Sequence, residues 1–244
     1  MDWFAVVGRL LPRRLRVAIK ERLDVPSMAW GLRNLSQCGF RPKVIWDVGA
    51  YEGEWSLLAK SIFPEARLWM IEPQPSKRSI LEGACSKDPH RLSYIQALCG
   101  AEPKEGVAFY LNETVSSVLT EWEQSPGAYE SMVMTTLDRL CEGSPIGMPD
   151  LIKLDVQGYE LEVLKGAQHL LEVHAPEVLV LEVSLIDINK GAPLWSEVDR
   201  WMENHGYRLY DICTLIRRPS DQALWQVDAM YVHASSSLLA SKRW

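Results

Sequence analysis

The fold of this chain is decided by Val44-Ile-Trp-Asp-Val-Gly-Ala-Tyr-Glu-Gly-Glu-Trp-Ser56, which predicts a buried strand, a glycine turn and a helix. A second stretch, Leu68-Trp-Met-Ile-Glu-Pro73, predicts another buried strand that ends in the carboxylate of Glu72. Glu72 lies about 20 residues beyond the last turn glycine, the spacing of an acid that binds ribose hydroxyls. Together the two stretches predict a βαβ unit that binds an adenosine-containing cofactor.

Acidic residues surround the predicted turn. Asp47 precedes Gly49, and Glu52 and Glu54 flank Gly53. Carboxylates here would repel the pyrophosphate that a dinucleotide fingerprint places against bare glycines at a helix N-terminus. S-adenosylmethionine, a cationic ligand without phosphate, suits the turn better, and Asp-x-Gly-x-x-x-Gly is the pattern of class I methyltransferases. The alternative is a surface turn with solvated acids, and the strand-ending glutamate at its matching position favours the cofactor site.

The composition indicates one α/β domain and excludes a second large one. The chain has 244 residues, of which 47% are hydrophobic and 24% charged, enough for a single complete core. The net charge of −6 provides no basic face for nucleic acid, which we exclude as a substrate. Five cysteines without C-x-x-C spacing predict reduced thiols in a cytoplasmic protein, with neither disulfides nor a zinc site.

The N-terminal residues differ from the rest. Residues 1–23 mix apolar side chains with six basic ones, which predicts a basic amphipathic helix interrupted near Pro12. Such a helix would make peripheral contact with a membrane or a partner, or would pack on the domain. No apolar stretch approaches the roughly 18 residues that span a bilayer. We therefore expect a helical extension at 1–40, a methyltransferase domain at 41–235 and a tail at 236–244.

Beyond the extension, buried strands alternate with helices, as in a doubly wound sheet. Parallel strands are predicted at 43–48, 66–71, 92–98, 151–154 and 178–183. Helices are predicted at 30–38, 55–62, 76–86, 160–171 and 195–205. An added strand at 107–111 is expected to pair antiparallel with 92–98, and 207–212 and 229–233 are the last strands. This order predicts a Rossmann-like α/β fold of class I methyltransferase type, with three α/β/α layers and a mostly parallel sheet whose last strand is antiparallel.

A second motif begins at the fourth parallel strand: Asp150-Leu-Ile-Lys-Leu-Asp-Val-Gln-Gly-Tyr-Glu-Leu-Glu-Val-Leu-Lys-Gly-Ala167. Together with the glycine turn, Ile71-Glu-Pro73 and Thr136-Leu-Asp-Arg-Leu140, it resembles the FkbM-type methyltransferases. The resemblance runs from about residue 44 to residue 183, and more weakly to residue 231. That family uses S-adenosylmethionine to methylate hydroxyl groups, often on sugars or secondary metabolites.

The resemblance implies a set of cofactor-binding residues: Asp47, Gly49, Ala50, Gly53, Glu72 and Asp155. Glu72 would hold the ribose hydroxyls, and Asp155 would face the methionine end or the reaction centre. Ser116 and Ser117 match a recurrent serine pair of the family. Gln157 is a departure, because relatives commonly have an acid there.

Geometry leads to the same candidates without the family. Ligands of open α/β sheets bind beyond the carboxyl ends of the parallel strands. Acidic residues are predicted at such ends: Asp47, Glu72, Asp155, Glu182 and Asp211. The five histidines are predicted on the opposite face, so we do not expect a histidine base.

Methyl transfer to an alcohol needs an in-line approach and an acceptor for the hydroxyl proton. Asp155 is the first catalytic candidate, although a nearby sulfonium would lower its pKa. Glu182, on the neighbouring strand, is the second candidate, as the better acceptor or as its partner. The two carboxylates could instead hold a divalent cation that acidifies the hydroxyl. A further alternative pairs Glu182 with Lys153, because a buried lysine needs a partner.

Three functions follow from these observations. The favoured one is an O-methyltransferase that acts on a small-molecule or glycan acceptor. The second is a nucleotide-dependent oxidoreductase, against which the acidic turn argues. The third is a non-catalytic cofactor-binding subunit of a biosynthetic pathway. The oligomeric state is unknown from the sequence.

Overall fold

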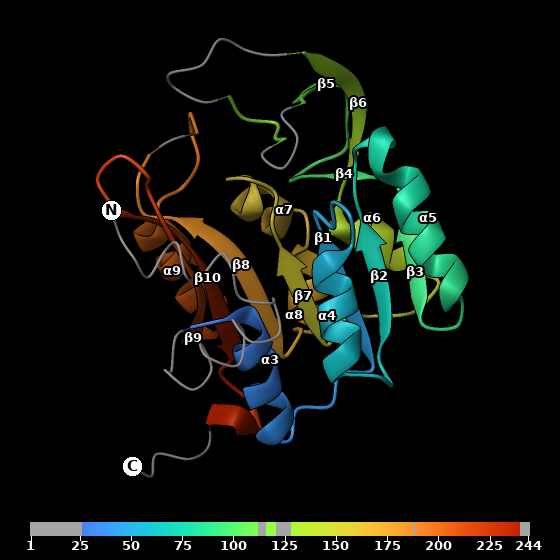
Figure 1. The fold of residues 1–244 in the computed structure, drawn as a ribbon, viewed down its shortest axis with the longest axis vertical. Coiled ribbons are helices and arrows are strands. Elements are labelled where there is room, and N and C mark those ends of the chain that lie inside the picture. Colours follow the sequence, from blue (N-terminus) through green and yellow to red (C-terminus); the bar gives the residue numbers. More distant parts are fainter. Residues whose placement is uncertain (1–25, 112–115, 121–127, 188, 240–244) are drawn as a thin grey trace, which may run out of the picture.

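A seven-stranded sheet with the order β3-β2-β1-β7-β8-β10-β9 forms the centre of the protein (Figure 1). The computed structural model describes residues 26–111, 116–120, 128–187 and 189–239. The strands of this sheet are β1 (Val44–Val48), β2 (Arg67–Ile71), β3 (Leu92–Ile95), β7 (Leu151–Leu154), β8 (Val178–Ser184), β9 (Tyr207–Arg217) and β10 (Leu224–His233). The first five run parallel, and β10 is antiparallel to both neighbours. The predicted Rossmann-like sheet with an antiparallel last strand is confirmed.

Side chains alternate between the two faces of the sheet, and each face has its own core. Ile45 and Leu68 pack into the cluster that includes helices α3 (Met28–Gln37), α4 (Glu54–Ile62) and α5 (Arg78–Lys87). Trp46 and Trp69 pack into the opposite cluster, with ring centroids 5.0 Å apart in a T-shaped contact. That cluster includes α6 (Leu137–Glu142), α7 (Glu160–Lys165), α8 (Gln168–Val173) and α9 (Trp195–Asn204). Figure 1 shows α4 in front of the sheet and α8 and α9 behind it, which gives the predicted three layers.

The single helix predicted at 160–171 consists of two helices, because the chain turns between α7 and α8. Gly166 is the residue at which α7 ends, and its backbone lies close to the backbone of Gly100. A Cβ atom on Gly166 would lie 2.1 Å from the carbonyl oxygen of Gly100. Any residue with a Cβ atom would collide with Gly100, so this position between the two helices requires glycine.

A second sheet, with the order β4-β6-β5, lies beyond the carboxyl ends of the parallel strands (Figure 1). Its strands are β4 (Leu98–Cys99), β5 (Lys104–Tyr110) and β6 (Tyr129–Thr135). The predicted pairing of 107–111 with 92–98 is wrong, because β5 pairs antiparallel with β6, for instance Val107 with Met132. The predicted strand 92–98 divides after Ile95: β3 stays beside β2, whereas β4 pairs with β6. Adjacent strands in the sequence are thus separated between two sheets.

The last two strands form a hairpin that is longer than predicted. β9 continues to Arg217 and β10 begins at Leu224. Asp211 therefore lies inside β9 rather than at a strand end, which corrects the prediction. A Cβ atom on Gly31 of α3 would lie 3.7 Å from Asp211 Oδ2, so this carboxylate faces α3.

Helix α3, within the predicted extension 1–40, packs on the sheet through the buried Leu32 and Leu35. The basic segment 1–23 lies outside the described residues. Among the helices that are described, none combines the length and the apolar character needed to cross a membrane.

Candidate functional site

A cavity of about 410 Å³ lies at the carboxyl ends of β1, β2, β7 and β8. Four of the predicted site residues line it: Gly49, Glu72, Asp155 and Glu182. The other three are Asp47, Ala50 and Gly53, which shape the strand end and the turn but are not part of the described lining. The cavity is where open α/β sheets bind ligands, because the strand order reverses between β1 and β7.

The turn between β1 and α4 depends on left-handed backbone conformations. Gly49 has φ +81°, Tyr51 φ +48° and Gly53 φ +79°. The amides of Gly49 and Ala50 donate to the carbonyl oxygen of Ile71, at 2.9 and 3.2 Å, which ties the turn to β2. A Cβ atom on Gly49 would lie 1.9 Å from the carbonyl oxygen of Asp155. This closeness to β7 requires glycine.

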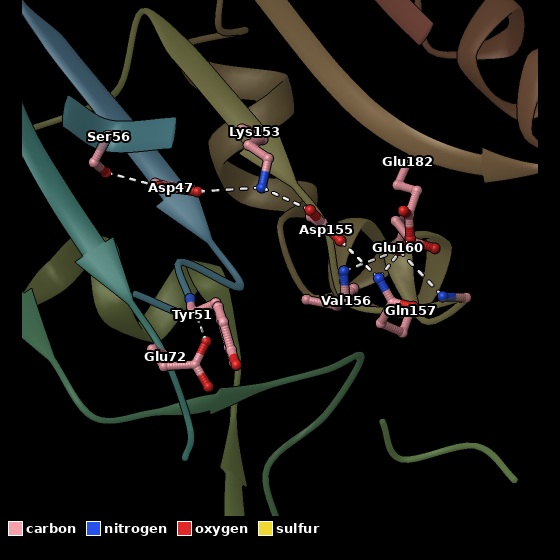
Figure 2. A network of polar contacts seen from close by, with 11 residues as sticks. Asp47, Tyr51, Ser56, Glu72, Lys153, Asp155, Val156, Gln157, Glu160 and Glu182 are labelled. Atoms are coloured by element: carbon pink, nitrogen blue, oxygen red, sulfur yellow. Dashed lines mark hydrogen bonds and ion pairs between the residues drawn. The ribbon is translucent and has the colours of Figure 1, made fainter. Parts of the chain in front are cut away.

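Glu72 ends β2 and is fixed by the backbone around it. It is 3% exposed, its Oε2 accepts from the amide of Tyr51 at 2.8 Å, and its Oε1 accepts from the amide of Gln74 at 3.0 Å. Figure 2 shows the carboxylate beside Tyr51. Burial raises the pKa of Glu72, and the two backbone hydrogen bonds oppose this shift. Because each carboxylate oxygen has two lone pairs, Glu72 can still accept hydrogen bonds from a diol in the cavity.

Asp47, Lys153 and Asp155 form a chain of charges, in which Asp47 and Lys153 are buried and Asp155 is partly exposed to the cavity (Figure 2). Lys153 Nζ lies 2.9 Å from Asp155 Oδ2 and 3.6 Å from Asp47 Oδ1, and Ser56 Oγ donates to Asp47 Oδ2 at 2.7 Å. Burial lowers the pKa of Lys153, but the two aspartates outweigh it and raise the pKa, so the lysine stays charged. Its ion-pair partners are these aspartates, which corrects the alternative that Lys153 pairs with Glu182. Asp47 thus does not line the cavity, but it helps to hold Lys153 beside Asp155.

Gln157 connects the two predicted catalytic carboxylates. Its Nε2 donates to Asp155 Oδ1 at 2.9 Å and to Glu182 Oε2 at 2.7 Å (Figure 2). Its carbonyl oxygen accepts from Ser117 Oγ and from Asn189 Nδ2, both at 3.0 Å. Gln157 has φ +56°, a conformation that costs a non-glycine residue energy and persists where the surroundings impose it. Gln157, which departs from the family pattern, therefore holds the site together through its side chain and its carbonyl oxygen.

This arrangement does not fit the predicted divalent cation. The amide of Gln157 directs N–H groups at both carboxylates, where a metal would need oxygen ligands. Within the described part of the chain, no group of three or more His, Cys, Asp or Glu side chains could hold an ion. We derive no metal chemistry from this site.

The far side of the cavity is formed by residues that the sequence analysis did not identify. Ile216 of β9 and Trp225 and Gln226 of β10 line it, and we call these three residues the hairpin wall. Phe109 of β5 adds an apolar side chain from the small sheet. No local motif marks these positions, since their roles depend on how the hairpin and the small sheet lie over the strand ends.

Residues 47–209 match the sequence model of the methyltransferase FkbM domain. The chain belongs to the FkbM methyltransferase family. This match confirms the resemblance inferred from the glycine turn and the second motif.

One curated relative and one solved structure show how far the similarity extends. The chain is 28% identical over 131 residues to the hexuronic acid methyltransferase AglP of Haloferax volcanii, an alignment that covers 53% of this chain. The chain spans about half the length of this relative, 52%. The methyltransferase FkbM from Methylobacillus flagellatus has a similar fold, with a TM-score of 0.50 and 17% identity over 78% of this chain and 43% of that one.

In this FkbM-family site, Asp155 and Glu182 have opposite pKa shifts. Burial raises the pKa of Asp155, but the charge and hydrogen bond of Lys153 outweigh burial and the pKa is lowered. Burial raises the pKa of Glu182 well above its usual value, and the charges of Asp155, Glu160 and Asp228 add to the shift. Two neighbouring carboxylates with shifts of opposite sign can divide a charge-stabilising role and a proton-accepting role.

Glu160 is a further residue of the site that the sequence analysis did not single out. It is 2% exposed, and its Oε1 accepts from the amides of Val156 at 2.9 Å and Gly158 at 3.2 Å. Burial raises its pKa to about 7. The side chain thus closes the loop that carries Gln157. The signal for this role was the position of a glutamate two residues after a glycine.

Proposed function

We propose that this chain is an O-methyltransferase that transfers the methyl group of S-adenosylmethionine to a hydroxyl of a sugar or another hydroxylated metabolite. The observation that carries the proposal is the charge of the cavity. Glu72, Asp155 and Glu182 line it, and its described lining contains no Lys, Arg or His. An anionic cavity at the switch point of the sheet favours a cationic nucleoside over a pyrophosphate cofactor.

The residues present fit S-adenosylmethionine. Glu72 offers acceptor lone pairs for the ribose hydroxyls, beside the glycine turn. Pro73, Gln74 and Tyr51 also line this end, where they could enclose the adenine. Asp155, held ionised by Lys153, would face the positive charges of the methionine part. Each group therefore has a partner of suitable charge.

Bound S-adenosylmethionine supplies an electrophilic methyl group on a cationic sulfur. With it bound, the methyl group would pass to the acceptor oxygen, the carbon–sulfur electron pair would stay on sulfur, and Glu182 would take the hydroxyl proton. The raised pKa of Glu182 makes it the stronger base of the two carboxylates. Gln157 would hold Glu182 toward the acceptor through its 2.7 Å hydrogen bond.

A sugar acceptor is supported by the relative AglP, whose name describes a hexuronic acid methyltransferase. The two chains are 28% identical over about half of each. This similarity supports a sugar as the class of acceptor and does not identify the particular sugar. Oxygen as the methyl-accepting atom rests on the carboxylate base and on the family resemblance.

Calorimetry and a transfer assay test the proposal. We expect S-adenosylhomocysteine, the demethylated product, to bind to the purified chain, and NADH not to bind. Label from tritiated S-adenosylmethionine should then pass to hydroxylated acceptors. Tight binding of NADH with no heat from S-adenosylhomocysteine would replace the proposal by the oxidoreductase alternative. Binding without transfer to any acceptor would leave the non-catalytic alternative.

A further inference from the structure

The cavity has two chemically different ends. Glu72 and the glycine turn form one end, and the hairpin wall lies on the opposite side together with Phe109. Glu182, the proposed proton acceptor, belongs to β8, the strand beside the hairpin. An acceptor whose hydroxyl meets Glu182 would therefore contact the hairpin wall.

Gln226 is an unusual member of this wall. It is only 6% exposed and lines the cavity. Its backbone is fixed between Ser184 of β8 and Ile216 of β9. Beside it in the same wall, the indole Nε1 of Trp225 is buried with no hydrogen-bond partner among the described residues. Buried polar groups are normally hydrogen-bonded, so an indole N–H without a partner, next to a buried amide at the same cavity, indicates a polar ligand group. A primary amide donates and accepts, which matches a hydroxyl or a pair of hydroxyls.

Charge restricts the ligand further. The described lining carries carboxylates but no basic side chain, and Lys153, behind it, is engaged by Asp47 and Asp155. A carboxylate on the acceptor would lose its water without gaining a cationic partner, and it would be repelled by the acids of the site.

We propose that the acceptor is an uncharged hydroxylated compound, such as a neutral sugar. It would be bound through a hydroxyl to the amide of Gln226, with an apolar face against Ile216 and Trp225, and carboxylated sugars would be rejected. This inference rests on the proposed function and specifies its substrate class. The expected preference differs from the hexuronic acid in the name of the relative AglP.

The test compares matched acceptors that differ only at carbon six. Nitrophenyl glycosides of glucose, galactose and mannose are assayed beside the corresponding uronides, with S-adenosylmethionine as donor. We expect the neutral member of an accepted pair to have a kcat/KM at least about 100-fold higher, and the uronide methyl ester to recover most of the loss. An equal or better rate with the free uronide would overturn the inference and leave the proposed function standing.

Variants of the hairpin wall test whether Gln226 determines the preference for neutral acceptors. Gln226→Leu should lower kcat/KM for the neutral acceptor about tenfold, while the affinity for S-adenosylhomocysteine stays unchanged. Gln226→Arg should raise the relative rate with the uronide. Gln168→Leu, at an exposed position of α8, is the matched control and should change neither value. Unchanged selectivity in a folded Gln226→Arg variant would contradict the assigned role. Binding of S-adenosylhomocysteine with no transfer to either member of any pair would overturn the sugar acceptor itself.

Discussion

The two ends of the cavity are built in different ways. The proposed cofactor end is local: the glycine turn and Glu72 belong to one βαβ unit and are joined by backbone hydrogen bonds. The proposed acceptor end contains side chains from β5, β8, β9 and β10, which the fold brings together from distant parts of the sequence. The first end can be recognised from spacing alone, whereas the second is defined only by tertiary structure.

Glu182→Gln should have the largest effect and should separate the two ends. We expect the rate of methyl transfer to fall about 10² to 10⁴-fold, because the amide cannot accept the hydroxyl proton. The affinity for S-adenosylhomocysteine should change less than about threefold, since Glu182 lies away from Glu72. Single-turnover transfer and calorimetry measure the two quantities. Glu105→Gln, at an exposed position of β5, is the control.

The same variant gives a pH test. Asp155, Glu160, Asp228 and Lys153 act on Glu182, and burial together with the three acids raises its pKa. Only the ionised carboxylate accepts a proton, so the wild-type rate should fall as pH decreases through this raised pKa. The remaining rate of Glu182→Gln should lack that dependence. An identical pH profile in both proteins would assign the base elsewhere.

Gly49→Ala tests the local end. Its Cβ would collide with the carbonyl oxygen of Asp155, and the φ of +81° disfavours a side chain. We expect a loss of about 3 kcal/mol in the free energy of unfolding, measured with urea. Gly83→Ala is the matched control, because a Cβ there meets nothing within 4 Å and α5 should gain about 0.5 to 1 kcal/mol. Equal stabilities of the two variants would contradict the described approach of β1 to β7.

Glu160→Gln tests the loop between the two ends. Burial raises the folded-state pKa of Glu160 from 4.5 to about 7. The folded protein therefore binds this proton more tightly than the unfolded chain does, and stability falls as pH rises from about 4.5 to about 7. The variant should lack this loss, which amounts to at most about 3 kcal/mol. Urea unfolding at several pH values measures it, and parallel curves for the two proteins would refute the assignment.

Glu72→Gln should have the smallest effect of these variants, and it should change only the affinity for the cofactor. One oxygen becomes an N–H₂ group that opposes the amide of Tyr51 or Gln74, and a charged acceptor for the ribose is lost. We expect the affinity for S-adenosylhomocysteine to fall about 10 to 100-fold, measured by calorimetry. The neutral-to-uronide ratio should stay unchanged. A change in that ratio would mean that the two ends are coupled.

The sequence predicted what depends on short spacing. The parallel strands, the glycine turn and the placement of Glu72 and Asp155 at the cavity all follow from motifs in which a few consecutive residues determine the backbone. Glu182 was also placed at the cavity, but its partner was not predicted: a side chain on a sheet has several neighbours, and Gln157 rather than Lys153 contacts it.

Long-range pairing was the main source of error. The strand at 107–111 was assigned to its predecessor in the sequence, because hairpins are the common connection between neighbouring strands. β5 instead pairs with β6, in the second sheet. Gln226 was missed for a related reason, since an amide within a strand has no sequence signal until its surroundings are known.

The hairpin has a consequence for how acceptor preference can change. All three residues of its wall lie within the single stretch 216–226, whereas the described residues that surround the cofactor end lie outside that stretch. Under the proposed function, exchanging this hairpin between homologues would therefore alter the acceptor and leave the cofactor end unchanged. Acceptor specificity could then be moved from one family member to another with this hairpin. Chimaeras that exchange only residues 216–226 would be a direct way to obtain new acceptors.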